Sequence, residues 1–108
     1  MITNLTKHTT ISETELRATS ICQQARGLMF RTKHNLIMTF EKPRKISLHN
    51  FFVFYPLDIL LLDEQKQIIE IKYNFKPFTF YTAQQKATYV IELAHKNNNY
   101  NVKDILEF

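Results

Sequence analysis

The sequence predicts a single α+β domain, mainly β, over residues 1–108, in which a curled antiparallel or mixed sheet or a partial barrel carries one short helix. Three patterns favour this fold class. Between residues 51 and 62 only Pro56 and Asp58 interrupt an apolar run, so the stretch must be buried on more than one face. Within residues 67–73 the apolar Ile69, Ile71 and Tyr73 alternate with charged side chains, as in strands. The elements alternate too irregularly for repeated strand–helix–strand units, and this favours a curled sheet.

Size and composition are those of a folded intracellular domain. The 108 residues, 44% of them hydrophobic, are enough to bury a core without disulfides or metals. The lone cysteine, Cys22, cannot form an internal disulfide. The first eight residues lack the apolar segment of a signal peptide, and the run at 51–62 is shorter than the ~20 residues that span a bilayer. We therefore expect a cytoplasmic protein without a membrane segment.

The N-terminal part predicts strands followed by the only helix. Thr and β-branched residues before residue 19 favour two strands or one broken strand. Ser20 and Gln23 then match a capping box, and apolar residues recur with helical spacing after them. A short helix is expected near residues 20–27, with Gly27, the only glycine of the chain, at its C-terminus.

The middle of the chain predicts three strands. Residues 35–40 form a short buried strand that ends in a charged turn at 41–45, and the next strand covers residues 46–53. Pro56 cannot donate a hydrogen bond to a neighbouring strand, so the chain should bend or bulge there. A separate strand is expected at residues 57–63.

The C-terminal half continues as a hairpin and further strands. A polar turn at 63–66 leads into the strand at 67–73. After Pro77, which lies in an extended aromatic segment, polar residues predict another turn. The remaining expected elements are an extended segment at 74–82, a turn at 84–86, a strand at 88–93, a loop at 97–101 and a last strand at 105–108. The stretch 83–94 also fits a helix, and this alternative stays open.

Charge, glycine content and histidine spacing argue against several classes of site. The net charge is +4, and its densest basic cluster lies at residues 42–45, with Arg31 and Lys33 upstream. A basic turn with a proline is most often a solvated loop, so nucleic acid is not an expected partner. One glycine is too few for a phosphate-binding loop, and the four histidines show no metal-ligand spacing. We expect no metal and no cofactor.

Two motifs carry a family resemblance. Residues 25–31 (ARGLMFR) match an R-G-L-M-x-R signature, and residues 46–58 (ISLHNFFVFYPLD) match an aromatic segment ending in P-[LI]-D. Residues 76–78 (KPF) and 89–93 (YVIEL) fit the same pattern further on. The chain thus resembles the family called domain of unknown function 192, and its archaeal members in particular. This resemblance implies a β-rich fold with one short helix and implies no reaction, because the family has no established activity.

The chain departs from the family pattern at three places. Residues 94–96 (AHK) and 102–104 (VKD) lack the glycines that family members usually carry near these positions. Asn or Lys must then hold a backbone geometry that glycine holds easily, so the geometry of the turn at 95–104 is left open. The third departure is Asn50, where a methionine is typical.

Asp58 is the first candidate site residue, because an ionised carboxylate within an apolar run needs a partner. Arg26 and Arg31 are the obvious cations. An ion pair between Asp58 and one of them, next to Gly27, would anchor the helix to the sheet. Asp58 accepting backbone amides around the bend at Pro56 would do the same. Alternatively, His49 and Asp58 share a cleft as acid and base of a hydrolase-like enzyme.

Aromatic residues suggest a second kind of site. A curled sheet lined by them would leave a groove for a small ligand or a protein partner, with Arg31 and His49 at its mouth. The candidate lining residues are Phe51, Phe54, Tyr55, Phe78, Phe80 and Tyr81. Of all these residues, Arg31, His49, Tyr55, Phe78 and Tyr81 are the ligand-binding candidates. A small binding or scaffold module is therefore the first hypothesis for function, and the hydrolase is the alternative.

Overall fold

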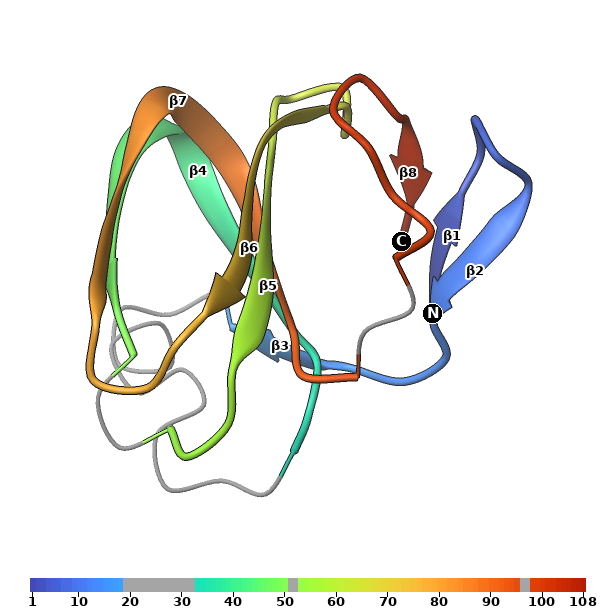
Figure 1. Ribbon diagram of the computed structural model, residues 1–108. Coiled ribbons are helices and arrows are strands. Elements are labelled where there is room, and N and C mark those ends of the chain that lie inside the picture. Colours follow the sequence, from blue (N-terminus) through green and yellow to red (C-terminus); the bar gives the residue numbers. More distant parts are fainter. Residues whose placement is uncertain (19–32, 51–52, 96–97) are drawn as a thin grey trace.

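The described part of the chain folds into two β-sheets. The computed structural model describes residues 1–18, 33–50, 53–95 and 98–108. A three-stranded sheet has the order β2-β1-β8, and a five-stranded sheet has the order β3-β4-β7-β5-β6 (Figure 1). The strands of the small sheet are β1 (Ile2–Asn4), β2 (Thr9–Ser12) and β8 (Leu106–Glu107). Those of the large sheet are β3 (Leu16–Ala18), β4 (Leu36–His49), β5 (Leu57–Leu62), β6 (Ile68–Phe75) and β7 (Phe80–Leu93).

The mainly β prediction is confirmed, with two sheets instead of one. The large sheet is mixed, because β3 pairs with β4 in parallel while all its other pairs of neighbouring strands are antiparallel. Strands β3 and β6 are its two ends, so the described strands form no closed barrel. The helix predicted at 20–27, with Gly27 at its end, lies outside the described residues. Within those that are described, no helix is long and apolar enough to cross a membrane.

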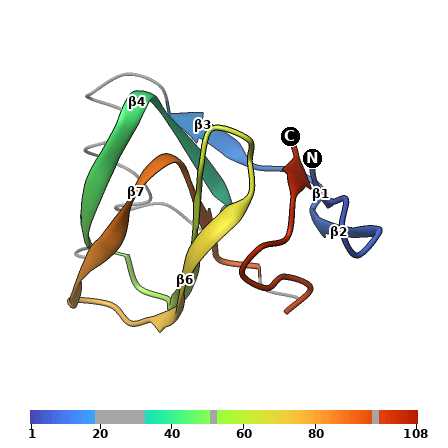
Figure 2. The same ribbon diagram turned by 90° about the horizontal axis from the view of Figure 1, so that it is seen from above.

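The core lies on both faces of the large sheet. Every residue of β5 is buried, and alternate side chains enter two different apolar clusters. Leu57, Ile59 and Leu61 belong to one cluster, and Leu60 and Leu62 belong to the other. The second cluster also holds residues of the small sheet, which lies to one side of the large one in both views (Figures 1 and 2). Burial on both faces therefore explains the continuous apolar run, as the sequence predicted.

Two predicted turns are wrong, because both lie inside long continuous strands. The register of β4 with β7 is interrupted between Thr39 and Arg44, where β4 carries more residues than its partner. The register is interrupted a second time between Thr82 and Lys86 in the first half of β7, where β7 carries more residues than β4. The polar segments at 41–45 and 84–86 are thus β-bulges that bend the two strands, and β4 and β7 bend over together near the top of Figure 1. A bulge tolerates Pro43, whose nitrogen cannot donate to a neighbouring strand.

The strand pairing decides between strand and helix at residues 83–94 and tests two further predictions. Residues 80–93 form strand β7, so the strand and not the helix is found there. The break at Pro56 is confirmed, since β4 ends at His49 and β5 begins at Leu57. The hairpin is confirmed as well: one carboxylate oxygen of Asp63 accepts the amides of residues 65 and 67 at 2.9 and 3.0 Å.

The turn at 95–104, which lacks the family's glycines, still contains residues with the left-handed backbone that glycine favours. Lys103 has φ 81° and Asn98 has φ 59°. The amide of Lys103 donates to the carbonyl of Ile68 at 2.7 Å, and the carboxylate of Asp104 accepts the side-chain amide of Asn4 and the amide of Asn101 at 2.8 Å each. These bonds hold the turn, although the strand after it is shorter than predicted.

Candidate functional site

The surroundings of Asp58 hold it in the core. Its side chain is buried, and it accepts the amide of Asn74 at 2.9 Å and the hydroxyl of Tyr100. Burial and the Asp58 carboxylate raise the pKa of Tyr100 well above its usual value, so the phenol stays protonated and donates a hydrogen bond to Asp58. Asp58 therefore has partners that fix its place in β5. The three other residues of the predicted anchor, Arg26, Gly27 and Arg31, lie outside the described residues, so an ion pair with Asp58 stays a prediction.

His49 is described through its backbone only. It ends β4 and pairs with Phe80 at the start of β7. Asp58 lies elsewhere in the sheet, opposite Leu93. The side chain of His49 lies outside the described part of the structure, so the acid–base pair of a hydrolase also stays a prediction.

The predicted aromatic residues fall into two groups. Tyr55 is buried in the first apolar cluster, and Tyr81 packs against the same cluster. The hydroxyl of Tyr81 donates to the carboxylate of Glu70, and burial together with this carboxylate raises the pKa of Tyr81 to about 12. Both tyrosines thus contribute to the core. Phe51 lies outside the described residues.

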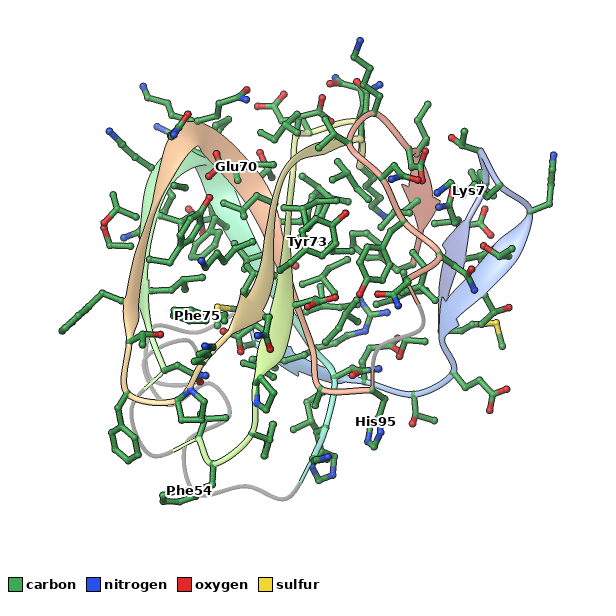
Figure 3. All side chains as sticks on the ribbon, viewed as in Figure 1. Lys7, Phe54, Glu70, Tyr73, Phe75 and His95 are labelled. Atoms are coloured by element: carbon green, nitrogen blue, oxygen red, sulfur yellow. The ribbon has the colours of Figure 1, made fainter. Side chains whose placement is uncertain are left out.

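The other three aromatic residues form an exposed group. Phe54, Phe78 and Phe80 are 64%, 55% and 73% exposed. The rings of Phe54 and Phe78 meet edge to face, with 6.1 Å between their centroids. Figure 3 shows Phe54 pointing outward at the lower end of the molecule, while Glu70 lies near the opposite end. We call these three residues the aromatic end.

A strained turn presents Phe78 at this end. Its φ is 61°, in the left-handed region, which costs roughly 1–2 kcal/mol for a residue with a side chain. Buried Asn50 holds the turn with three hydrogen bonds. Its carbonyl accepts the Phe78 amide at 2.7 Å, its amide donates to the Thr79 carbonyl at 2.9 Å, and its side chain donates to the Phe75 carbonyl at 2.9 Å. The departure of residue 50 from the family pattern was the sequence signal for this role.

Sequence reasoning also missed Glu92. This residue is buried in β7, opposite Leu36 on one side and Ile59 on the other. Burial raises the pKa of its carboxyl group to about 7. The available signal was a carboxylate between Ile91 and Leu93 in a strand that is otherwise apolar at this point.

The described residues assemble no metal centre. No three His, Cys, Asp or Glu side chains among them gather closely enough to hold an ion. The buried carboxylates of Asp58, Glu92 and Asp104 lie in or beside the two cores. These features define the chain as a small two-sheet β domain with an exposed aromatic end.

The chain belongs to the DUF192 family, described as Uncharacterized ACR, whose model matches residues 2–103. Similar curated proteins come from archaea. The UPF0127 protein PH1112 of Pyrococcus horikoshii is 31% identical over 84 residues, which cover 74% of this chain and 72% of that protein. A UPF0127 protein of Thermococcus sibiricus is 29% identical over 79 residues, which cover 69% of this chain. The match spans about half (51%) of that relative's length.

A solved structure shares the fold. A protein of unknown function from Novosphingobium aromaticivorans superposes with a TM-score of 0.78 at 22% identity. The superposition covers 91% of this chain and 81% of that one. The two-sheet arrangement is therefore found outside the archaeal relatives as well.

Proposed function

We propose that the chain is a binding module that contacts its ligand or partner through the aromatic end, Phe54, Phe78 and Phe80. One observation carries this proposal: the ring of Phe78 is more than half exposed although its backbone is held in a strained conformation. An exposed apolar ring gains little from folding, and a left-handed phenylalanine costs stability. Strained backbone of this kind persists where surrounding structure enforces it, and it is common at binding sites.

The anchoring by Asn50 supports the same function. Its three hydrogen bonds hold both sides of the turn that carries Phe78, so the ring is presented in one place. Binding costs less free energy when the contacting group is already ordered. Large aromatic side chains are also enriched in the contact surfaces of proteins. A rigid turn with an exposed ring is thus suited to recognition.

The hydrolase alternative gains no support from the described residues. The bonds of Asp58 to Tyr100 and Asn74 are those of a carboxylate that holds segments together. We keep the predicted cytoplasmic location as part of the proposal, since the single cysteine allows no internal disulfide.

Nuclear magnetic resonance with small aromatic probes tests the proposed surface. Indole and 4-methylphenol are titrated into the ¹⁵N-labelled protein, and the shifts of the backbone amide signals are followed. We expect saturable shifts at Asn50, Phe54 and the segment 75–80, because the probes should stack on the exposed rings.

Two variants make this test specific. Phe78→Ser should abolish the shifts, whereas Val102→Ser should leave them unchanged, because Val102 is an exposed apolar residue of another loop. Shifts that persist in Phe78→Ser, or that gather away from the aromatic end, would overturn the proposal.

A further inference from the structure

A basic surface continues from the aromatic end along β4 and β7. In the register of these strands Lys45 lies opposite Lys86, Ser47 lies opposite Thr82, and His49 lies opposite Phe80. Lys45, Ser47, Thr82 and Lys86 are exposed, while the intervening Ile46 and Ala83 are buried. Side chains directly opposite each other on neighbouring strands lie on the same face, and the hydroxyl oxygens of Ser47 and Thr82 are 3.5 Å apart. In β4 the buried Ile46 separates Lys45 from Ser47, so the four exposed residues share the outer face. We call these four residues the basic ribbon.

Basic residues outnumber acidic ones on this surface, where the carboxylate of Glu70 reaches the amides of Gln84 and Gln85 between Thr82 and Lys86. The segments 42–49 and 80–86 contain four Lys and Arg residues and no Asp or Glu, which equals the net charge of +4 of the whole chain. Like charges directly opposite each other on neighbouring strands are destabilising. Among the described residues, no carboxylate forms an ion pair with Lys45 or Lys86. An anion bound between these two ammonium groups would remove their repulsion.

We infer that the basic ribbon and the aromatic end together bind single-stranded nucleic acid. The lysines and the hydroxyl groups of Ser47 and Thr82 contact phosphates, which such groups do in most complexes with nucleic acids. Phe80 and Phe78 stack on bases, which is the sequence-tolerant contact of proteins that bind single strands. This inference rests on the proposed function, since it names the partner of the same aromatic end.

The spacing of the surface fits an extended strand. Successive outward residues of a regular β-strand are roughly 7 Å apart, so the polar groups follow a line, as the phosphates of an extended single strand do. A duplex fits less well, because an exposed ring stacks only on a base that has left its own stack. An acidic protein segment would complement the charge of the lysines, but it would offer no base to stack on Phe78 and Phe80.

The pairing of the two lysines explains why the sequence did not indicate this partner. Residues 42–45 look like an isolated basic turn along the chain. The structure makes them part of a bulged strand and places Lys86 opposite Lys45. The exposed Phe80 lies further along the same pair of strands, opposite His49. The combination of charge and aromatic rings appears only when β4 and β7 are paired.

Fluorescence anisotropy tests this inference with the full chain. The probes are labelled oligothymidylate and oligouridylate of about 12 nucleotides, a length within the range that small single-strand-binding domains cover. A DNA duplex of the same length and polyglutamate serve as competitors. We expect single strands to bind with an affinity that falls as salt rises. Tighter binding of oligouridylate would identify RNA as the natural strand, and tighter binding of oligothymidylate would identify DNA.

Variants separate the two kinds of contact. Lys45→Gln with Lys86→Gln should reduce the slope of log affinity against log salt by about 1.4, or about 0.7 for each lost phosphate contact. Phe80→Ala should weaken binding about 5- to 150-fold and leave the salt slope unchanged, because stacking involves no counterion release. Lys103→Gln, which removes an exposed charge from another loop, should leave the slope as it is.

The outcomes also separate this inference from the proposed function. If the aromatic probes bind and the oligonucleotides do not, the nucleic-acid partner is wrong and the aromatic binding surface stands. If neither binds, both are wrong. Competition by polyglutamate or duplex as strong as that by single strands would show a general polyanion surface and would overturn the single-strand assignment.

Discussion

Tyr100 donates its hydroxyl hydrogen to the buried carboxylate of Asp58, and this bond joins the C-terminal segment to β5. The ring of Tyr100 is itself buried and stacks with Tyr73 at 6.4 Å between centroids. Asp58 therefore has a structural role in the described part of the chain, whether or not an arginine of the segment 19–32 also contacts it. The sequence predicted an anchor between Asp58 and an arginine and did not indicate Tyr100 as a partner.

Replacing Tyr100 by phenylalanine should destabilise the fold. Tyr100→Phe keeps the buried ring and removes one donor from a buried carboxylate, which costs about 1.5–3 kcal/mol. Urea unfolding at neutral pH measures the loss. Tyr73→Phe is the matched control, because it removes a hydroxyl from a half-exposed ring on the same stack. Equal stability of the two variants would show that the bond to Asp58 does not stabilise the fold.

Glu70 should be essential for the bulge in β7. Its carboxylate accepts the amides of Gln84 and Gln85 at 3.0 and 3.2 Å and also the hydroxyl of Tyr81. Glu70→Gln removes the charge from these bonds and should destabilise the fold by about 1–3 kcal/mol. The pKa of Tyr81, raised to about 12, should fall partway toward its usual value, because burial persists while the carboxylate is lost.

Thermal unfolding and ultraviolet titration of the tyrosines measure these two effects. Glu64→Gln is the control, since Glu64 is an exposed residue of the hairpin turn. An unchanged tyrosine titration in Glu70→Gln would show that the hydroxyl of Tyr81 does not depend on Glu70.

Much of the fold could be predicted because burial leaves a pattern in the chain. A strand buried on both faces reads as a continuous apolar run, and a half-buried strand alternates, so β5, β6 and the hairpin between them were recognisable. Bulges are different. The polar residues at 41–45 and 84–86 look like turn residues in the sequence, and only the pairing of β4 with β7 and the contacts of Glu70 identify them as bends within strands.

The candidate site was harder to predict for a related reason. Tyr55, Phe78, Phe80 and Tyr81 are all aromatic, and the last three lie close in sequence. The two tyrosines nevertheless pack in the core, while the two phenylalanines face solvent. The turn at Pro77 breaks the alternation, so counting residues along the chain does not assign their faces. The buried position of Asn50 depends on contacts with residues 75–79, which are distant in sequence.

The strained turn predicts a conflict between stability and binding at Phe78. Asparagine tolerates the left-handed backbone, so Phe78→Asn relieves strain of roughly 1–2 kcal/mol and loses the ring contact with Phe54, worth about 0.5–1.5 kcal/mol. We expect a melting temperature that is unchanged or higher, together with loss of the aromatic-probe shifts. Phe80→Asn, at a strand position, should lower the melting temperature instead. Strong destabilisation by Phe78→Asn with binding retained would show that the ring serves the fold.

The buried carboxyl of Glu92 should make stability fall as pH rises. Burial raises its pKa from 4.5 to about 7 in the folded protein. Below pH 4.5 the carboxyl group is neutral in both the folded and the unfolded state, so folding does not have to bury a charge. Between these two values the unfolded chain loses the proton first, and stability falls. Above about pH 7 both states are ionised and the loss is constant at roughly 3 kcal/mol.

Glu92→Gln isolates this effect, because it keeps the size of the side chain and cannot ionise. Urea unfolding across the window from 4.5 to about 7 should show a declining free energy of unfolding for the natural chain and a flatter profile for the variant. At about pH 8 the variant should be the more stable protein by up to roughly 3 kcal/mol. Glu107→Gln, in an exposed position of β8, should keep the natural profile. If Glu92→Gln declines in parallel with the natural chain, the pKa of Glu92 is the same in the folded and unfolded states, and burial does not raise it.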